Sequence, residues 1–109
     1  MELDKETQEK IKELQICEQN YQTLLIQKQA FQMELNDTEN ALSEVSKSKD
    51  DVFKIIGNIM IKTDKEKTEK ELERKKEILT LRLSSIEKQE TELSSQIEEI
   101  KKEVMKKIK

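Results

Sequence analysis

The sequence predicts a mostly α-helical protein: an antiparallel two-helix coiled coil connected by one β-hairpin, which joins an intersubunit β-barrel. Apolar residues recur at a 3-4 spacing over residues 3–45 and again over 72–107. A repeat sustained beyond three or four heptads is typical of a coiled coil. Between the repeats lies a stretch rich in β-branched residues with the only glycine, and no proline interrupts either helix. We expect residues 1–109 to form a single domain.

The composition alone is compatible with a coiled coil or with disorder. Charged residues make up 41% of the chain and aromatic residues 3%, whereas an ordinary soluble domain is about 25% charged. Such a composition can keep a chain unfolded, but the heptad repeat decides for the coiled coil. Residues 1–51 carry six lysines against twelve acidic residues, and residues 64–109 carry thirteen basic against twelve acidic residues. An acidic helix beside a nearly neutral one favours their pairing.

The first helix is expected over about residues 3–47. Its apolar residues fall at heptad positions a (Leu14, Tyr21, Leu35, Leu42) and d (Leu3, Cys17, Leu24, Phe31, Val45). The polar residues that interrupt this stripe are Thr7, Lys10, Lys28 and Thr38. Two apolar positions in seven make a narrow stripe, which suits a partner helix and is too narrow for a membrane surface.

Residues 52–63 are expected to form the hairpin, because Gly57-Asn58 suits a two-residue turn in which glycine supplies a positive φ. Pairing across this turn leaves apolar residues on both faces of the ribbon. One face carries Phe53, Ile55 and Met60, and the other carries Val52, Ile56, Ile59 and Ile61. A two-stranded ribbon is marginal alone in water and leaves its edges unpaired. The hairpin therefore predicts an oligomer in which strands from several chains combine.

The second helix is expected over about residues 64–108, and Thr63-Asp-Lys-Glu66 reads as a capping box with Thr63 at the N-cap. Its stripe has Leu83, Ile97 and Val104 at a, and Leu72, Leu79, Ile86, Leu93 and Ile100 at d. The polar interruptions are Lys76, Glu90 and Lys107.

Two registers bring the stripes of antiparallel helices together, with partner numbers adding up to 114 or to 121. Leu35 lies opposite Leu79 in the first and opposite Ile86 in the second. In both, Lys28 and Glu90 occupy neighbouring layers, so we predict an ion pair that marks the register more than it stabilises the coil.

The residues for catalysis are missing. There is no histidine, the single glycine cannot build a phosphate-binding loop, and Cys17 has neither a histidine nor a second thiol as partner. We therefore expect no enzyme activity, no cofactor and no metal. The one cysteine and the acidic N-terminus, which does not resemble a signal peptide, indicate a cytoplasmic protein. The acidic first helix and the seam position of Tyr21 argue against nucleic acid, although the basic tail KKEVMKKIK keeps a nucleic-acid-associated coil as a minor alternative.

The open end of the coil, where the first helix begins and the second ends, carries the residues that could bind another protein. Ile11, Ile16, Met105 and Ile108 lie outside the heptad stripe, and Leu3 and Val104 lie in it close enough to the end to be exposed by fraying. Scattered exposed apolar residues are normal on any surface. As a set, they predict an adaptable apolar surface, to which methionine is well suited.

Three runs of the sequence resemble the β-type subunits of the archaeal prefoldin family. They are Leu25-Ile-Gln-Lys-Gln29 continuing to Leu35, Val52-Phe-Lys-Ile-Ile-Gly-Asn-Ile-Met-Ile-Lys-Thr-Asp-Lys65, and Leu83-Ser-Ser-Ile-Glu-Lys-Gln-Glu90. The resemblance implies an ATP-independent co-chaperone, a hexamer of two α and four β subunits whose hairpins form a double β-barrel. It also implies that the coil tips hold unfolded client proteins and deliver them to a group II chaperonin. The single hairpin matches the β type, since α subunits have two.

Two features depart from the family pattern: the chain has no proline, and its open end is rich in lysine. The alternative to a holdase is a structural or scaffolding coiled coil in which the hairpin only connects the helices. Suppression of client aggregation without ATP separates the two.

Overall fold

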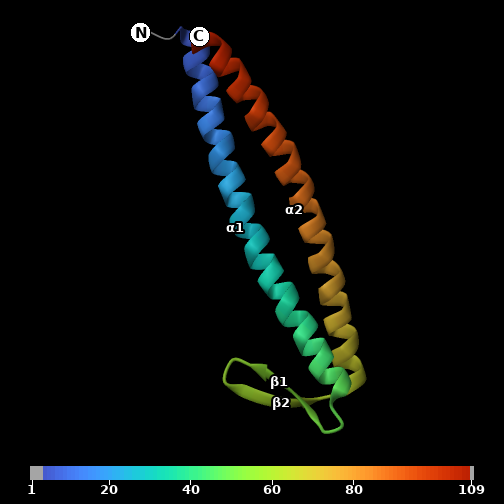
Figure 1. Cartoon of the computed structure of the whole chain (residues 1–109). Coiled ribbons are helices and arrows are strands. Elements are labelled where there is room, and N and C mark those ends of the chain that lie inside the picture. The colour runs from blue at the N-terminus through green and yellow to red at the C-terminus, as the bar shows by residue number, and fades with distance from the viewer. Residues whose placement is uncertain (1–3, 109) are drawn as a thin grey trace. The chain divides into compact units, whose positions relative to one another are not determined.

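The computed structural model describes residues 4–108, which form two helices and one β-hairpin (Figure 1). Helix α1 spans Lys5–Lys47 and helix α2 spans Lys65–Ile108. Strands β1 (Val52–Ile56) and β2 (Ile59–Thr63) lie between them in the chain and form a two-stranded antiparallel sheet. The predicted order of helix, β-hairpin and helix is therefore confirmed.

Each helix begins after an aspartate. The Oδ1 atom of Asp4 accepts a hydrogen bond from the Thr7 backbone amide at 2.7 Å, and the Asp4 carbonyl accepts one from Gln8 at 3.1 Å. This is the bonding of an N-cap residue. The Asp64 carbonyl likewise accepts the first helical bond of α2, from Thr68 at 3.0 Å. The predicted cap at Thr63 is thus wrong by one residue: the N-cap is Asp64, and Thr63 is the last residue of β2.

The chain divides into two compact units. The first contains the beginning of α1 up to Gln29 and α2 from Ser84 onward, and the second contains residues 30–83 with the hairpin. In the described part of the first unit, residues 4–29 and 84–108, the buried apolar residues all come from α2. They are Ile86, Ile97, Ile100 and Val104. The residues of α1 that face them are less completely covered, and the buried one is Thr7, at heptad position a.

The second unit has its core beside the hairpin junction, where Leu35, Leu79 and Leu83 are buried and Phe31 packs against them. The guanidinium of Arg82 lies 5.6 Å from the centre of the Phe31 ring, so a charged side chain covers the half-buried aromatic by a cation–π contact. Lys75 and Glu34 form an ion pair at 3.4 Å across the two helices.

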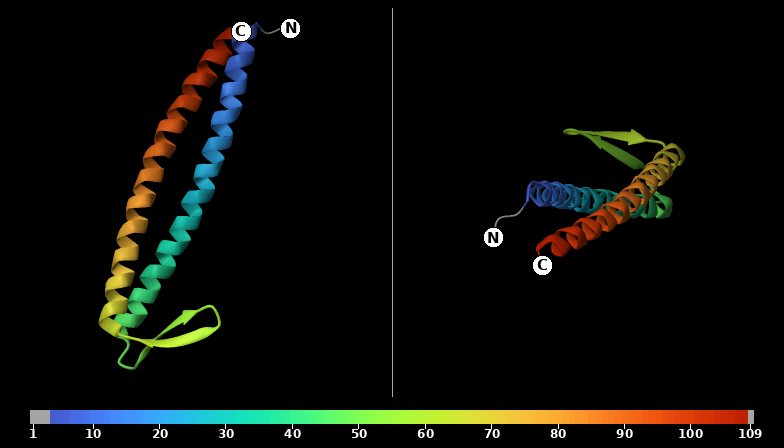
Figure 2. Two further views of the ribbon diagram at one scale, coloured as in Figure 1. Left: turned by 180° about the vertical axis from the view of Figure 1, so that it is seen from behind. Right: turned by 90° about the horizontal axis from the view of Figure 1, so that it is seen from above.

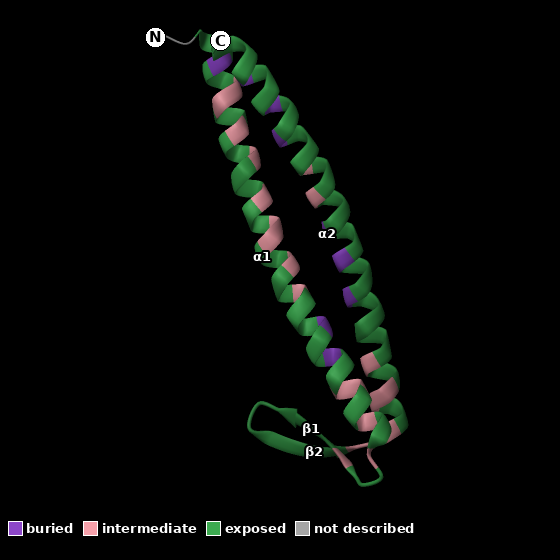
Figure 3. Cartoon of the chain, viewed as in Figure 1, coloured by how far each residue is buried: buried purple, intermediate pink, exposed green. Residues whose placement is uncertain are grey.

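The apolar stripes predicted from the heptad repeat lie on the covered sides of the helices (Figure 3). Every apolar residue assigned to an a or d position within residues 4–108 is buried or half-buried, including Cys17. Of the polar interruptions, Thr38 is buried because its hydroxyl donates to the Glu34 carbonyl at 2.8 Å. Lys76 and Lys107 are exposed, as long charged side chains can be at a seam edge.

Both units adopt the first of the two predicted registers. Leu35 clusters with Leu79 in the second unit, and these numbers add up to 114. In the first unit, Lys10 pairs with Glu103, whose numbers add up to 113. The sequence alone left two registers open because both bring apolar layers together.

Candidate assembly and binding surfaces

The hairpin exposes apolar side chains on both of its faces. Its register pairs Ile56 with Ile59, Ile55 with Met60 and Phe53 with Lys62, as predicted. The ribbon projects from the helix ends instead of packing on them (Figures 1 and 2). Ile55 is 69% exposed and Ile59 is 63% exposed. The other exposed apolar residues are Phe53, Ile56, Met60 and Ile61, while Val52 is half-buried beside the junction.

The turn of the hairpin depends on Gly57. Its φ is +60°, and no other residue within 4–108 has a positive φ. A positive φ at the first central residue only is the pattern of a type II′ turn, whose twist matches that of the flanking strands. A Cβ atom at this position would meet nothing within 4 Å, so backbone conformation and not space requires glycine here.

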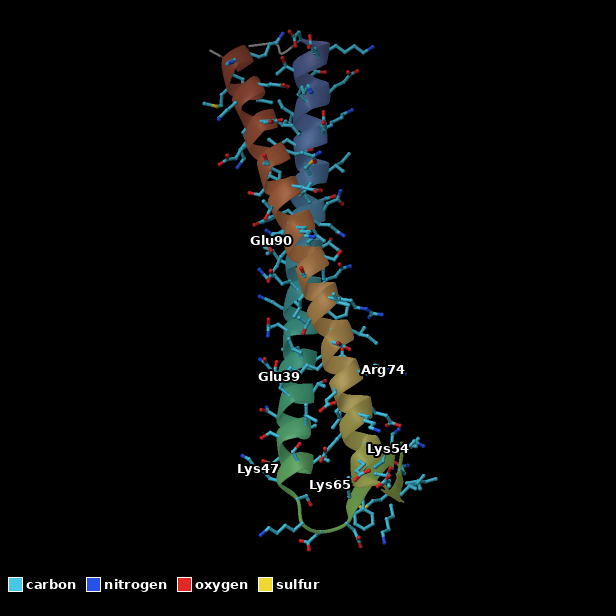
Figure 4. All side chains as sticks on the ribbon, turned by 90° about the vertical axis from the view of Figure 1, so that its right-hand side faces the viewer. Glu39, Lys47, Lys54, Lys65, Arg74 and Glu90 are labelled. Carbon is cyan, nitrogen blue, oxygen red and sulfur yellow. The ribbon has the colours of Figure 1, made fainter. Side chains whose placement is uncertain are left out.

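The junction between hairpin and helices is held by Lys65, the first residue of α2. Its Nζ atom donates to the Ser48 carbonyl at 2.8 Å and to the Ser46 carbonyl at 3.2 Å. It thereby satisfies carbonyl groups at the end of α1, close to Lys47 (Figure 4). A positive charge at the C-terminal end of a helix is also favoured by the helix dipole. The connector between α1 and β1 is therefore bonded to α2 through Lys65.

The open end of the coil carries three exposed apolar residues of the six predicted there. Ile16 is 58% exposed, Met105 54% and Ile108 42%. Met105 and Ile108 are three residues apart on one helix and so lie on neighbouring positions of its surface. In the observed register, Ile16 is level with residue 98, seven residues further along the coil than Met105, which is about 10 Å.

The other three predicted residues are placed differently. Ile11 is half-buried. Val104 is 8% exposed and packs in the seam, where its heptad position was predicted to place it, so its contact with another protein through fraying of the helix ends stays a prediction. It packs there because heptad position a points into the partner helix up to the end of α2. Leu3 lies outside the described residues.

Ion pairs link the two helices at the open end, and this arrangement was not predicted from the sequence. Lys107 lies 3.9 Å from Asp4 and 3.7 Å from Glu6, and Lys10 lies 3.2 Å from Glu103. Hydrogen bonding to Glu103, together with its charge, raises the pKa of Lys10. Hydrogen bonds from the Thr7 side chain and backbone amide lower the pKa of Asp4. The signal available in the sequence was the acidic start of α1 facing the lysine-rich end of α2.

Near the boundary of the first unit at Gln29, Lys28 and Glu90 form the predicted seam ion pair. The Nζ and Oε2 atoms are 3.0 Å apart, and the Tyr21 hydroxyl lies 3.5 Å from the other carboxylate oxygen of Glu90. The hydrogen bond to Glu90 and its negative charge raise the pKa of Lys28. The prediction of this pair is confirmed.

Residues 4–108 contain no group of three potential metal ligands, and none of their helices is long and apolar enough to cross a membrane. Exposed apolar side chains are found on the hairpin faces and at the open end of the coil, among other places on the helices.

Comparison with known proteins identifies the same architecture elsewhere. The family model for prefoldin subunits matches residues 8–109. A prefoldin subunit beta of Sulfurisphaera tokodaii is 39% identical over 101 residues, which are 91% of this chain and 81% of the relative. The prefoldin subunit beta of Pyrococcus furiosus is 35% identical, over 84% of this chain and 80% of that protein.

A solved structure is also similar. The crystal structure of the prefoldin beta subunit from Thermococcus strain KS-1 aligns with a TM-score of 0.87 at 30% sequence identity, and the alignment covers 96% of this chain and 94% of the other.

Proposed function

The chain belongs to the prefoldin subunit family, and from this premise we propose that it is an ATP-independent holdase subunit that binds non-native proteins at the open end of its coiled coil. Prefoldin is a co-chaperone family and not an enzyme family, and its β subunits are parts of a hetero-oligomeric assembly. We further propose that this chain occupies the β positions of an α2β4 hexamer in the cytoplasm and delivers its clients to a group II chaperonin.

The observation that carries this proposal is the exposure of two separate apolar surfaces on one charged chain. The hairpin presents apolar residues on both faces, which suits the strands of other subunits. The open end presents Ile16, Met105 and Ile108 outside the seam. Flexible apolar side chains of this kind can repack against many partners, as a client surface without sequence preference requires.

The test is suppression of aggregation of a chemically denatured reporter protein, measured by light scattering without ATP, by this chain assembled with an α-type subunit. Replacing Ile16, Met105 and Ile108 with serine should raise aggregation toward the level of the reporter alone. The matched control replaces Ile26, Met33 and Leu81 with serine, since these apolar residues lie outside the open end and are even more exposed than the three test residues. The control should protect as the unaltered assembly does.

Removing residues 1–11 and 104–109 should likewise abolish protection while the assembly keeps its number of subunits. An assembled oligomer that never suppresses aggregation would contradict the holdase function and favour the scaffolding alternative. If truncation breaks the oligomer, the proposed separation between assembly and client binding is wrong.

A further inference from the structure

Away from the open end, the first unit contains a shallow groove of about 450 Å³ along the seam between α1 and α2. Four amide side chains border it, and two seam leucines form its floor. They are Asn20, Gln27, Gln89, Gln96, Leu24 and Leu93. In the heptad repeat the amides all occupy position g and the leucines position d. The two helices therefore contribute matching sets, related by the antiparallel pairing.

The groove differs in chemistry from the rest of the surface. Positions e and g of coiled coils usually carry charged residues that form interhelical ion pairs. The next g positions toward the open end are charged: Glu103 forms an interhelical ion pair with Lys10 at 3.2 Å, and Glu13 lies 3.5 Å from the same lysine within α1. In a chain that is 41% charged, the lining of the groove includes only one charged residue, Glu92.

The amide groups are available to a ligand. Each offers a carbonyl acceptor and two N–H donors. All four residues are exposed, and none of these amides hydrogen-bonds to another group within residues 4–108. The Thr23 hydroxyl, also at the groove, is by contrast satisfied by the Gln19 carbonyl at 3.1 Å. Leu24 and Leu93 are half-buried, so they present some apolar surface between the amides.

This combination matches the main chain of an extended polypeptide. A backbone presents N–H and C=O groups alternately, and an amide side chain can pair with either. Asn20 and Gln27 are seven residues apart, about 10 Å along the helix, which corresponds to roughly three residues of an extended chain. A folded protein has its backbone groups paired internally, whereas those of a non-native chain are bonded to water, which an amide side chain can replace. The groove would therefore select unfolded segments without reading their side chains.

We propose that this amide groove is a second contact for client proteins and that it binds the extended backbone of a non-native segment by hydrogen bonds. The inference rests on the proposed holdase function, since the occupant is a client. It adds a contact of different chemistry: the open end takes apolar side chains, and the amide groove takes main-chain amides.

The experiment uses the chain assembled with an α-type subunit and a fluorescein-labelled decapeptide of alternating serine and leucine. Binding is measured by fluorescence anisotropy. The variant Gln27→Met/Gln89→Met keeps side-chain size and helix propensity but removes the amides. We expect it to bind the peptide about fivefold more weakly, as the loss of one or two hydrogen bonds would produce. The matched control, Gln19→Met/Gln22→Met, alters exposed glutamines outside the groove and should bind as the unaltered assembly does.

A second peptide, with every other backbone amide N-methylated, isolates the main-chain contribution. It should bind the unaltered assembly and the groove variant equally weakly. The inference is overturned if the groove variant binds the first peptide normally, if the control weakens binding as much, or if methylation has no effect. Aggregation suppression by the unaltered assembly is measured alongside. If the unaltered assembly suppresses aggregation but the groove variant binds the first peptide normally, only the groove proposal is refuted. If the unaltered assembly does not suppress aggregation, the holdase function itself is refuted.

Discussion

At the scale of single residues, the seam of this coil is specified by a few polar side chains among many leucines and isoleucines. Lys28 and Glu90 are bonded at 3.0 Å where an apolar residue would otherwise sit. The carboxylate-bearing side chain is 20% exposed, so leaving it without its partner is unfavourable. Leucine layers would pack in either register, and Lys28 and Glu90 lie in neighbouring layers in both; in the observed register they form the pair.

A charge exchange tests this role. Lys28→Glu places two negative charges together, and we expect the melting temperature, followed by circular dichroism, to fall by a few degrees. Glu90→Lys places two positive charges together and should lower the melting temperature by a similar amount. The double variant Lys28→Glu/Glu90→Lys restores the pair and should recover most of the loss. Additive losses in the double variant would show that the two residues do not interact in solution.

Asp4 provides a pH-dependent cap at the open end. Its pKa is lowered by hydrogen bonds from Thr7, so the folded helix prefers the ionised form. The stabilisation from this carboxylate is present above the ordinary value of 3.8 and is lost as the pH falls through the lower pKa of the folded state. We expect the Cα chemical shifts of residues 5–8 to lose helical character in that acidic window.

Asp4→Asn is the matched variant, because asparagine caps a helix about as well but does not titrate. Its first turn should keep the same helical shifts across the window. If the Cα shifts of Asp4→Asn lost helical character to the same extent in acid, the effect would come from other carboxylates.

At the scale of elements, the hairpin is defined by one backbone conformation. Gly57 has φ of +60°, which costs a residue with a Cβ about 1 kcal/mol or more. Gly57→Ala should therefore destabilise the assembled protein by about that amount, although no atom lies within 4 Å of the new methyl group. Urea denaturation of the assembly measures the change.

Gly57→Asn serves as the control for this position, because asparagine tolerates a positive φ better than alanine does. It should be less destabilised than Gly57→Ala. If alanine were as stable as glycine, the turn would adopt another conformation in the assembly.

At the scale of the whole molecule, the hairpin leaves the chain incomplete. A set of β-branched and aromatic side chains faces solvent on both sides of two strands, and a monomer gains nothing from that exposure. Membership of a hetero-oligomeric family accounts for it, since strands of neighbouring subunits can cover such a surface.

Charged residues on the hairpin should therefore prevent assembly. For Ile55→Glu/Ile59→Glu mixed with an α-type subunit, we expect native mass spectrometry to detect separate chains while circular dichroism still reports helices. Ile26→Glu/Leu81→Glu alters residues of comparable exposure on the helices, and it should assemble normally. Assembly of the hairpin variant would place the subunit contacts elsewhere.

Much of this organisation follows from residue pattern alone. Heptad spacing predicts both helices because burial of an apolar stripe repeats with the helical period. Glycine at position 57 predicts the turn because few residues accept a positive φ. The hairpin register then follows from the length of the loop, and the pairing of Ile56 with Ile59 agrees with it.

Other features required the tertiary structure. Heptad spacing does not distinguish between two registers, and the Leu35–Leu79 cluster decides between them. The bonds from Lys65 to the end of α1 and the ion pairs of Lys107 depend on which residues of one helix are level with which residues of the other. The sequence by itself determined the elements and their apolar faces, because these depend on local periodicity. Only the structure decided the register, the ion pairs at the open end and the amide groove, because each is formed by residues far apart in the chain.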